Sequence, residues 1–273
     1  MKSNSIKSSI KKAFTLVLGE KLTDGLITKI KGKERFFEEE EVLNKRIAFY
    51  SSFLKAGDLV FDVGSNMGNR IRPLLSLNLK VVAVEPQAAC CAYLRKTFGD
   101  KIILEQKGLG DKEEIKKMYV AEKQNYLSSF SEDWIAKMKE QRFQDADWNN
   151  VQEVQITTVD NLIARYGTPK FIKIDVEGYE LEVLKGLNKP INMMSFEYAV
   201  PENLQGLLSC LERLSVIEPG YLFNYSIGES MEFALTNWKT YEEMRAFVNT
   251  ESFIQASFGD IYVSLSKGTA IKQ

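Results

Sequence analysis

Residues 59–68, LVFDVGSNMG, constrain the fold more than any other stretch of the chain. An apolar run with β-branched residues ends abruptly in a segment with glycine at positions 64 and 68, and a helix-like segment opens at about Asn69. This order predicts a strand, a tight turn and a helix. Glycine lets the backbone approach a ligand where a Cβ would collide, and the first N–H groups of a helix are unpaired. The stretch therefore predicts a cradle for a small molecule.

An acid follows the next apolar strand. Residues 80–84 are expected to form that strand, which ends in Glu85, seventeen residues after Gly68. In doubly wound nucleoside-binding folds, an acid at this place accepts hydrogen bonds from both hydroxyls of a ribose. The turn and Glu85 together favour a nucleoside cofactor.

The glycine turn differs from the dinucleotide fingerprint, because it spaces only two glycines and Asp62 precedes them. A carboxylate there would repel a pyrophosphate but suits a cationic amino-acid ligand. S-adenosylmethionine carries an ammonium, a sulfonium and a ribose but no phosphate, so it is the expected cofactor. The alternative for the turn alone is an ordinary connection in which Asp62 caps the helix.

The composition limits which residues can act in catalysis or bind a metal ion. None of the 273 residues is histidine, which excludes a Ser-His-Asp triad, a Cys-His dyad and histidine metal ligands. A general base must therefore be Asp, Glu, Lys or Tyr, or a water that they hold. The 36 basic and 37 acidic residues nearly balance, so no nucleic-acid partner is expected. Three cysteines without metal-ligand spacing favour a reducing, cytoplasmic location.

The order of elements predicts an α/β fold. Strands alternate with helices over much of residues 59–214, which indicates a doubly wound, mostly parallel sheet with ligands at the carboxyl ends of its strands. Alternation at residues 221–225, 231–235 and 260–265 predicts an antiparallel finish. We assign residues 1–50 to an N-terminal helical cap and residues 51–273 to the main domain. No stretch reads as a transmembrane segment.

Residues 121–150 break this periodicity. Polar and aromatic residues alternate irregularly there, as in a functional insertion, and we expect a substrate lid. Ser128 and Ser129 are candidates to line a substrate. Ser131, followed by two acids, instead favours the simple start of a helix.

A second chemical cluster lies in residues 170–178, a strand that runs into another glycine-marked turn. In an extended segment Lys173, Asp175 and Glu177 share one face. A central parallel strand is normally apolar on both faces, so this charged face must be paired or must border a ligand. Two roles stay open for Lys173, because it either takes part in the chemistry or only neutralises a neighbouring acid.

Residues 171–186, FIKIDVEGYELEVLKG, closely resemble the signature of the FkbM family of S-adenosylmethionine-dependent methyltransferases. Residues 60–68, residues 84–86 and the strand that ends at Glu197 fall in that family's order, and the resemblance covers about residues 42–265. It implies a class I methyltransferase fold, which is Rossmann-like and has seven strands with the last antiparallel. It also implies O-methylation of a hydroxyl on a sugar, glycan or natural product.

Carried onto this sequence, the family pattern assigns the glycine turn to the methionine part of the cofactor and Glu85 to the ribose. Asp175 would lie beside the transferred methyl group, and Leu109 is expected to pack on the adenine. The cofactor-binding candidates are Asp62, Gly64, Ser65, Asn66, Gly68, Glu85, Pro86, Leu109 and Asp175.

We expect direct methyl transfer, in which the protein aligns an acceptor oxygen with the methyl donor and removes its proton. The catalytic candidates are Lys173, Asp175, Glu177 and Glu197. One of the three acids is expected to act as the base. The alternative is that they bind a divalent cation that lowers the pKa of the hydroxyl, and metal-free transfer is favoured over it.

Two other functions fit parts of the sequence. The first is an NAD-dependent sugar-modifying oxidoreductase or epimerase, against which Asp62 and the missing third glycine argue. The second is a non-catalytic binding module with a vestigial cofactor site, against which the intact acids at Glu85, Asp175 and Glu177 argue. The sequence leaves the acceptor and the oligomeric state open.

Overall fold

The computed structural model describes residues 40–121 and 125–265, and the chain divides into two compact units, Met1–Asn44 and Lys45–Gln273. The first described element is the helix α3 (Glu40–Ser51), whose opening residues belong to the first unit. Most of the helical cap expected at residues 1–50 lies outside the described residues. All the other described elements lie in the second unit.

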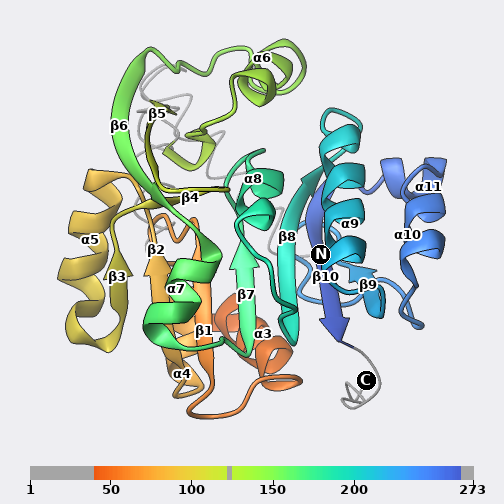
Figure 1. Cartoon of the computed structure of the whole chain (residues 1–273), viewed down its shortest axis with the longest axis horizontal. Coiled ribbons are helices and arrows are strands. Elements are labelled where there is room, and N and C mark those ends of the chain that lie inside the picture. Colours follow the sequence, from red (N-terminus) through yellow and green to blue (C-terminus); the bar gives the residue numbers. More distant parts are fainter. Residues whose placement is uncertain (1–39, 122–124, 266–273) are drawn as a thin grey trace, which may run out of the picture. The chain divides into compact units, whose positions relative to one another are not determined.

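Within the described residues, seven strands form the main sheet, in the order β3-β2-β1-β7-β8-β10-β9 (Figure 1). Their bounds are β1 (Leu59–Val63), β2 (Lys80–Val84), β3 (Ile103–Glu105), β7 (Phe171–Ile174), β8 (Met193–Ala199), β9 (Tyr221–Tyr225) and β10 (Phe258–Leu265). In this sheet β10 pairs antiparallel with both β8 and β9, and the other pairs are parallel. The expected doubly wound sheet with an antiparallel last strand, the class I methyltransferase fold, is thereby confirmed.

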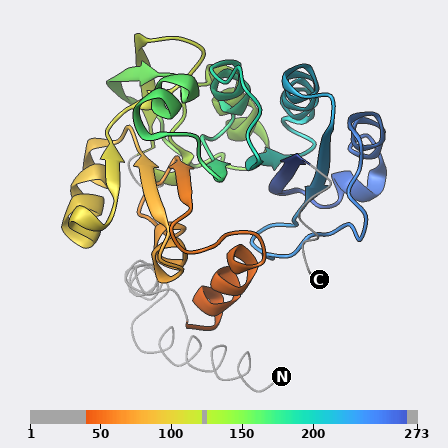
Figure 2. The same ribbon diagram turned by 60° about the horizontal axis from the view of Figure 1, so that its bottom comes forward.

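Helices cover both faces of this sheet (Figures 1 and 2). On one face, α3, α4 (Ile71–Ser76) and α5 (Ala88–Phe98) pack on strand residues such as Val60 and Phe171. The opposite face, with Phe61 and Ile172, is covered by α7 (Val159–Tyr166), α8 (Glu180–Lys185), α9 (Leu204–Ile217), α10 (Tyr241–Phe247) and α11 (Glu251–Ile254). Burial on both faces explains why these strands are apolar at almost every position. In residues 40–121 and 125–265, no helix combines the length and apolar content that crossing a membrane requires.

The insertion of residues 121–150 connects two strands of a second sheet. This sheet has the order β4-β6-β5, with β4 (Gly108–Leu109), β5 (Glu114–Val120) and β6 (Asn150–Thr157). Between β5 and β6 lies α6 (Glu132–Gln141), and Figure 1 shows it at the edge to which the parallel strands point. Ser131 caps α6 by accepting the N–H of Trp134 at 3.2 Å, which confirms the helix start expected there.

Residues 231–235, which were expected to form a strand, run irregularly between β9 and α10. Their alternation has another cause, because Met231 and Phe233 turn inward to pack on the core next to α3. The rings of Phe233 and Phe49, for example, lie 5.0 Å apart between centroids. Periodic burial here reflects side-chain packing and not a hydrogen-bonded ladder.

Arg142, just after α6, ties the insertion to the main sheet. Its guanidinium donates to both carboxylate oxygens of Glu202, at 2.5 and 2.9 Å, and to the carbonyl oxygen of Val200 at 2.9 Å. It also donates to the carbonyl and hydroxyl oxygens of Ser257, at 3.1 and 2.9 Å. The Glu202 side chain is only 6% exposed, so this carboxylate depends on Arg142 for its charge compensation.

Replacing Arg142 with methionine is expected to lower the free energy of unfolding by about 3 kcal/mol, because Glu202 is left buried without a counter-charge. Lys45→Met is the matched control, since Lys45 pairs with Glu232 at the surface, and it should change stability by less than about 1 kcal/mol. Urea unfolding measures both values. Equal midpoints for the two variants would show that Arg142 is not a structural anchor.

Candidate active site

The turn after β1 is held by backbone contacts. The N–H groups of Gly64 and Ser65 both donate to the carbonyl oxygen of Val84, and Gly64 has φ +79° and Gly68 φ +80°. A Cβ at Gly64 would overlap the carbonyl oxygen of Asp175, and one at Gly68 would press on the ring of Phe98. These glycines therefore let the chain approach itself closely. That they also admit a ligand stays a prediction.

Glu85 joins this turn to the start of α5. One carboxylate oxygen accepts the N–H of Asn66 and the other the N–H of Gln87, each at 2.8 Å. The side chain of Gln87 donates to this carboxylate as well. The residue is 2% exposed, and burial raises the pKa of Glu85 to about 7 in spite of these hydrogen bonds. A carboxylate has about four lone-pair sites, so Glu85 could still accept a hydroxyl.

Asp62, the polar residue inside β1, has an unsatisfied carboxylate oxygen. Within the described chain Oδ2 of Asp62 is buried and has no hydrogen-bond partner, although Lys173 is its register neighbour on β7. Burial raises the pKa of Asp62, and the nearby charge of Lys173 opposes this shift. Buried acceptors are nearly always paired, so an orphaned carboxylate oxygen beside a glycine turn fits a cationic ligand group.

The acidic residues that follow neighbouring strands meet at one edge. Since β1, β2 and β7 are parallel neighbours, Glu85 and Asp175 lie on either side of the end of β1. The N–H of Asp175 donates to the carbonyl oxygen of Val63 at 3.0 Å, which continues the β1–β7 ladder up to this acid. The two acids that the sequence analysis selected are thus on the same edge of the sheet.

Lys173 forms an ion pair with Asp175, with 2.5 Å between Nζ and Oδ2. Burial by itself would favour the neutral amine of Lys173, but the negative charges of Asp175, Asp260 and Asp62 outweigh it and raise the pKa of Lys173 above its usual value. The lysine therefore carries a buried positive charge under the edge. The ion pair agrees with the role of neutralising a neighbouring acid, one of the two roles left open for Lys173. That Lys173 also takes part directly in the chemistry stays a prediction.

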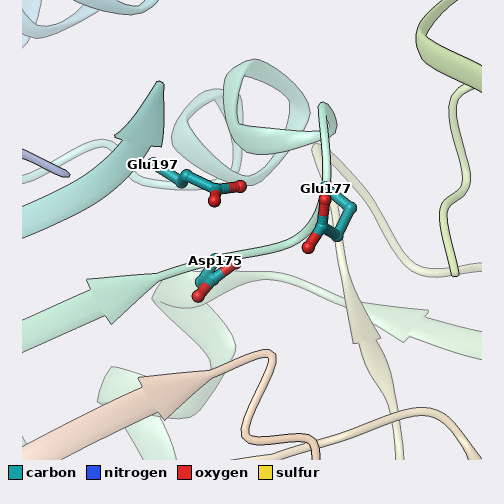
Figure 3. Close-up of side chains that lie close together, drawn as sticks. All are labelled: Asp175, Glu177 and Glu197. Atoms are coloured by element: carbon teal, nitrogen blue, oxygen red, sulfur yellow. The ribbon is translucent and has the colours of Figure 1, made fainter. Parts of the chain in front are cut away.

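The side chains of three acids, Asp175, Glu177 and Glu197, converge at this edge (Figure 3). One oxygen from each carboxylate lies within 4.8 Å of the others. β7 ends at Ile174, so Glu177 reaches the cluster through a turn, with φ +53°, and not through strand alternation. The carboxylates of Glu177 and Glu197 make no hydrogen bond or ion pair with any described residue. Burial and the neighbouring carboxylates raise the pKa of both groups.

This cluster can do two things chemically. Because burial and mutual repulsion disfavour its charge, it can share a proton among its carboxylates and so accept one from a substrate hydroxyl. Its oxygens are also of the kind that hard divalent cations prefer.

Several charged residues around the site were not expected from the sequence. Asp260 on β10 is the register neighbour of Glu197, and Arg70 before α4 lies 4.0 Å from it between NH2 and Oδ2. Arg70 and Arg46 both bind the carboxylate of Glu229. The sequence signal that could have identified Asp260 is its place as a polar residue in an alternating strand. No sequence signal points to Arg70, because its neighbours in the structure come from distant segments.

Not every candidate joins this edge. Leu109 on β4 is 2% exposed in the core that packs under α7 and α8, and its contact with adenine stays a prediction. The carbonyl oxygen of Pro86 accepts the side-chain amide of Gln152 at 3.1 Å. Ser128 in the insertion donates to the side chain of Gln87 at 3.2 Å. The insertion and β6 therefore reach the segment after Glu85.

The parallel sheet, the glycine turn and the acids at the ends of β2 and β7 define a class I methyltransferase domain. The chain belongs to the methyltransferase FkbM domain family, whose family model matches residues 62–254. It is therefore an S-adenosylmethionine-dependent methyltransferase, which confirms the resemblance seen in the sequence. A comparison with curated proteins gave no match.

The chain is also similar to solved methyltransferase structures. A TehB-like enzyme from Corynebacterium glutamicum is 7% identical with a TM-score of 0.45, over 89% of this chain and 97% of that one. A precorrin-6y C5,15-methyltransferase from Geobacter metallireducens is 12% identical with a TM-score of 0.42, over 81% and 86%. An O-methyltransferase from Bacillus cereus in complex with SAH is 11% identical with a TM-score of 0.40, over 95% and 97%.

Gly64→Ala is expected to destabilise the protein more than Gly57→Ala does. Both glycines have positive φ, which costs an alanine about 1–2 kcal/mol, but nothing lies near a Cβ at Gly57. At Gly64 the added methyl would overlap the carbonyl oxygen of Asp175, so a further loss of about 2 kcal/mol is expected. Denaturant unfolding measures the difference, and equal losses would mean that this close approach is not tight.

Glu85→Gln is expected to change how stability depends on pH. The pKa of Glu85 is raised to about 7, so the folded protein holds this proton more tightly than the unfolded chain, and ionisation above the unfolded pKa destabilises the fold. Relative to the variant, the parent should lose about 2 kcal/mol of unfolding free energy between pH 5 and pH 8. Urea unfolding without added nucleoside tests this, with the exposed Glu232→Gln as the control. Parallel pH curves for parent and Glu85→Gln would contradict it.

Proposed function

We propose that this methyltransferase moves the methyl group of S-adenosylmethionine to a hydroxyl of a sugar, glycan or natural product. The observation that carries the proposal is the convergence of Asp175, Glu177 and Glu197 next to the glycine turn. A hydroxyl needs a base before it attacks, and the chain has no histidine to act as one. Three carboxylates at the ligand edge of the sheet supply that function.

The cofactor would lie along the turn after β1. Asp62 would accept its ammonium group through the unpartnered Oδ2, and Glu85 would accept the ribose hydroxyls. The turn that connects these two acids is formed by the backbone of Ser65, Asn66 and Gly68. When bound, the sulfonium supplies an already activated methyl group, so the protein contributes mainly alignment and proton removal.

Lys173 on β7, the two acids after β7 and Glu197 on β8 would act on the acceptor. Lys173 holds Asp175 in place, and Asp175 orients the acceptor hydroxyl toward the methyl group. As the acceptor oxygen takes the methyl group, Glu177 or Glu197 takes its proton. A carboxylate with a raised pKa binds that proton more tightly than an ordinary one, which suits the role.

We propose transfer without a metal ion, as the sequence analysis favoured. The alternative, in which the three carboxylates hold a divalent cation that acidifies the hydroxyl, makes a different prediction. Under the proposal, dialysis against EDTA leaves the rate unchanged. Loss of turnover with recovery on adding Mg²⁺ would favour the cation.

The insertion of residues 121–150 is proposed to border the acceptor. Its described residues, 121 and 125–150, lie at the carboxyl edge (Figure 1), where Ser128 contacts Gln87 and Arg142 contacts Glu202. A lid role would follow if the insertion also opened for the acceptor.

Calorimetric titration with S-adenosylhomocysteine is expected to show saturable binding. Titration with NAD⁺ is expected to show no binding, because Asp62 repels a pyrophosphate.

The variant Asp175→Asn should still bind S-adenosylhomocysteine, but its rate of methyl transfer should fall by about 100-fold or more. Glu182→Gln is the control, since Glu182 pairs with Lys185 on α8 outside the cluster.

Turnover is followed by mass spectrometry as the gain of one methyl group on a panel of methyl glycosides, nucleotide sugars and phenols. A matching panel of amines and carboxylic acids tests the other acceptor classes. Transfer to an amine alone, or full activity of Asp175→Asn on its hydroxyl acceptor, would refute the proposed acceptor class or the role of Asp175.

A further inference from the structure

Ser129 of the insertion forms a hydrogen bond with the backbone of the Glu177–Gly178 turn. Its hydroxyl donates to the carbonyl oxygen of Glu177 at 2.6 Å and accepts the N–H of Ser131 at 3.0 Å. Ser129 is 1% exposed, and its own N–H and carbonyl pair with Tyr119 on β5 at 3.0 and 2.9 Å. The backbone of Ser129 is thus fixed by its pairing with β5, and its side chain extends from there to Glu177.

Trp134 of α6 covers the next residue of the turn. Its indole occupies the space beside Gly178 where a side chain would otherwise lie, because a Cβ there would overlap the ring. Trp134 is 5% exposed and belongs to a small core of the insertion, with Met138 and Trp148. The tryptophan therefore packs against the turn from a rigid support.

Glu180 holds the same turn from inside the main domain. Its carboxylate accepts the N–H groups of Val176 and Gly178, each at 3.2 Å. Between these contacts Glu177 has φ +53°, a conformation that costs a residue with a Cβ about 1–2 kcal/mol. Such a conformation persists only where its surroundings over-determine it.

We infer that Ser129 and Trp134 are positioning residues that hold the Glu177–Gly178 turn, so that the carboxylate of Glu177 faces those of Asp175 and Glu197. The inference deepens the proposed function and rests on it for the turn's part in catalysis. Ser129 restrains the carbonyl of Glu177, and Trp134 restrains the following glycine. If Glu177 relaxed to a negative φ, its side chain would leave the cluster.

The test follows the side-chain carboxyl carbon of Glu177 by NMR in protein labelled with ¹³C-glutamate, at one pH and without added nucleoside. Glu177→Gln identifies the signal. In Ser129→Ala the signal is expected to move toward that of an exposed glutamate, because its carboxylate neighbours are lost. Ser52→Ala is the matched control, since Ser52 donates to the carbonyl oxygen of Phe49 at 2.7 Å, away from the turn, and it should leave the signal in place.

The affinity for S-adenosylhomocysteine separates this inference from the proposed function. It should stay within about twofold in Ser129→Ala, because neither Glu85 nor the glycine turn is altered. An unmoved Glu177 signal in a folded Ser129→Ala protein overturns the inference. If that variant does not fold, Trp134→Phe carries the same test, and an unmoved signal there overturns it equally. Failure of the parent protein to bind S-adenosylhomocysteine overturns the proposed function and leaves the Glu177 measurement valid.

Discussion

The buried charge of Lys173 is the interaction around which the carboxyl edge of the sheet is built. Its amine lies 2.5 Å from Asp175 and also feels the charges of Asp62 and Asp260. Uncompensated burial of a single carboxylate costs several kcal/mol, and here Asp62 and Asp260 are buried and Asp175 is partly buried. Removing the lysine would leave like charges facing one another in a poorly solvated place. The edge can be acidic because this cation is already in position, with Arg70 beside Asp260.

The charge compensation at this edge is incomplete, and the remaining imbalance suits the proposed methyl transfer. Lys173 pairs with Asp175. For Glu177 and Glu197 its charge only partly offsets burial and the neighbouring carboxylates, which raise the pKa of both. Asp62 likewise keeps an unpartnered oxygen. A preorganised negative edge of this kind favours a cationic methyl donor and a proton leaving the acceptor. Its geometry depends on contacts from elsewhere, because the turn at Glu177 is held by the insertion as well as by the main domain.

Much of the fold could be predicted from short-range features of the sequence. Strand and helix periodicity, glycine at the turn after β1 and the serine cap at Ser131 are short-range signals, and the structure has these elements where they predict them. The segment at residues 231–235 shows the limit of such signals. Alternation there reports which side chains are buried, and only pairing with another strand could have made it a ladder.

What the sequence determined by itself is therefore the series of strands and helices, and with it the acids that follow β2 and β7, since residues at the ends of parallel strands share one edge. Only the tertiary structure decided that Glu177 meets Glu197, because that contact needs both the β7–β8 pairing and a turn with positive φ. It also brought Arg70 and Asp260 from distant parts of the chain to within 4.0 Å of each other, where their charges shift the pKa of Lys173. Long-range charge pairing has no period along a sequence, so it becomes visible only after the chain has folded.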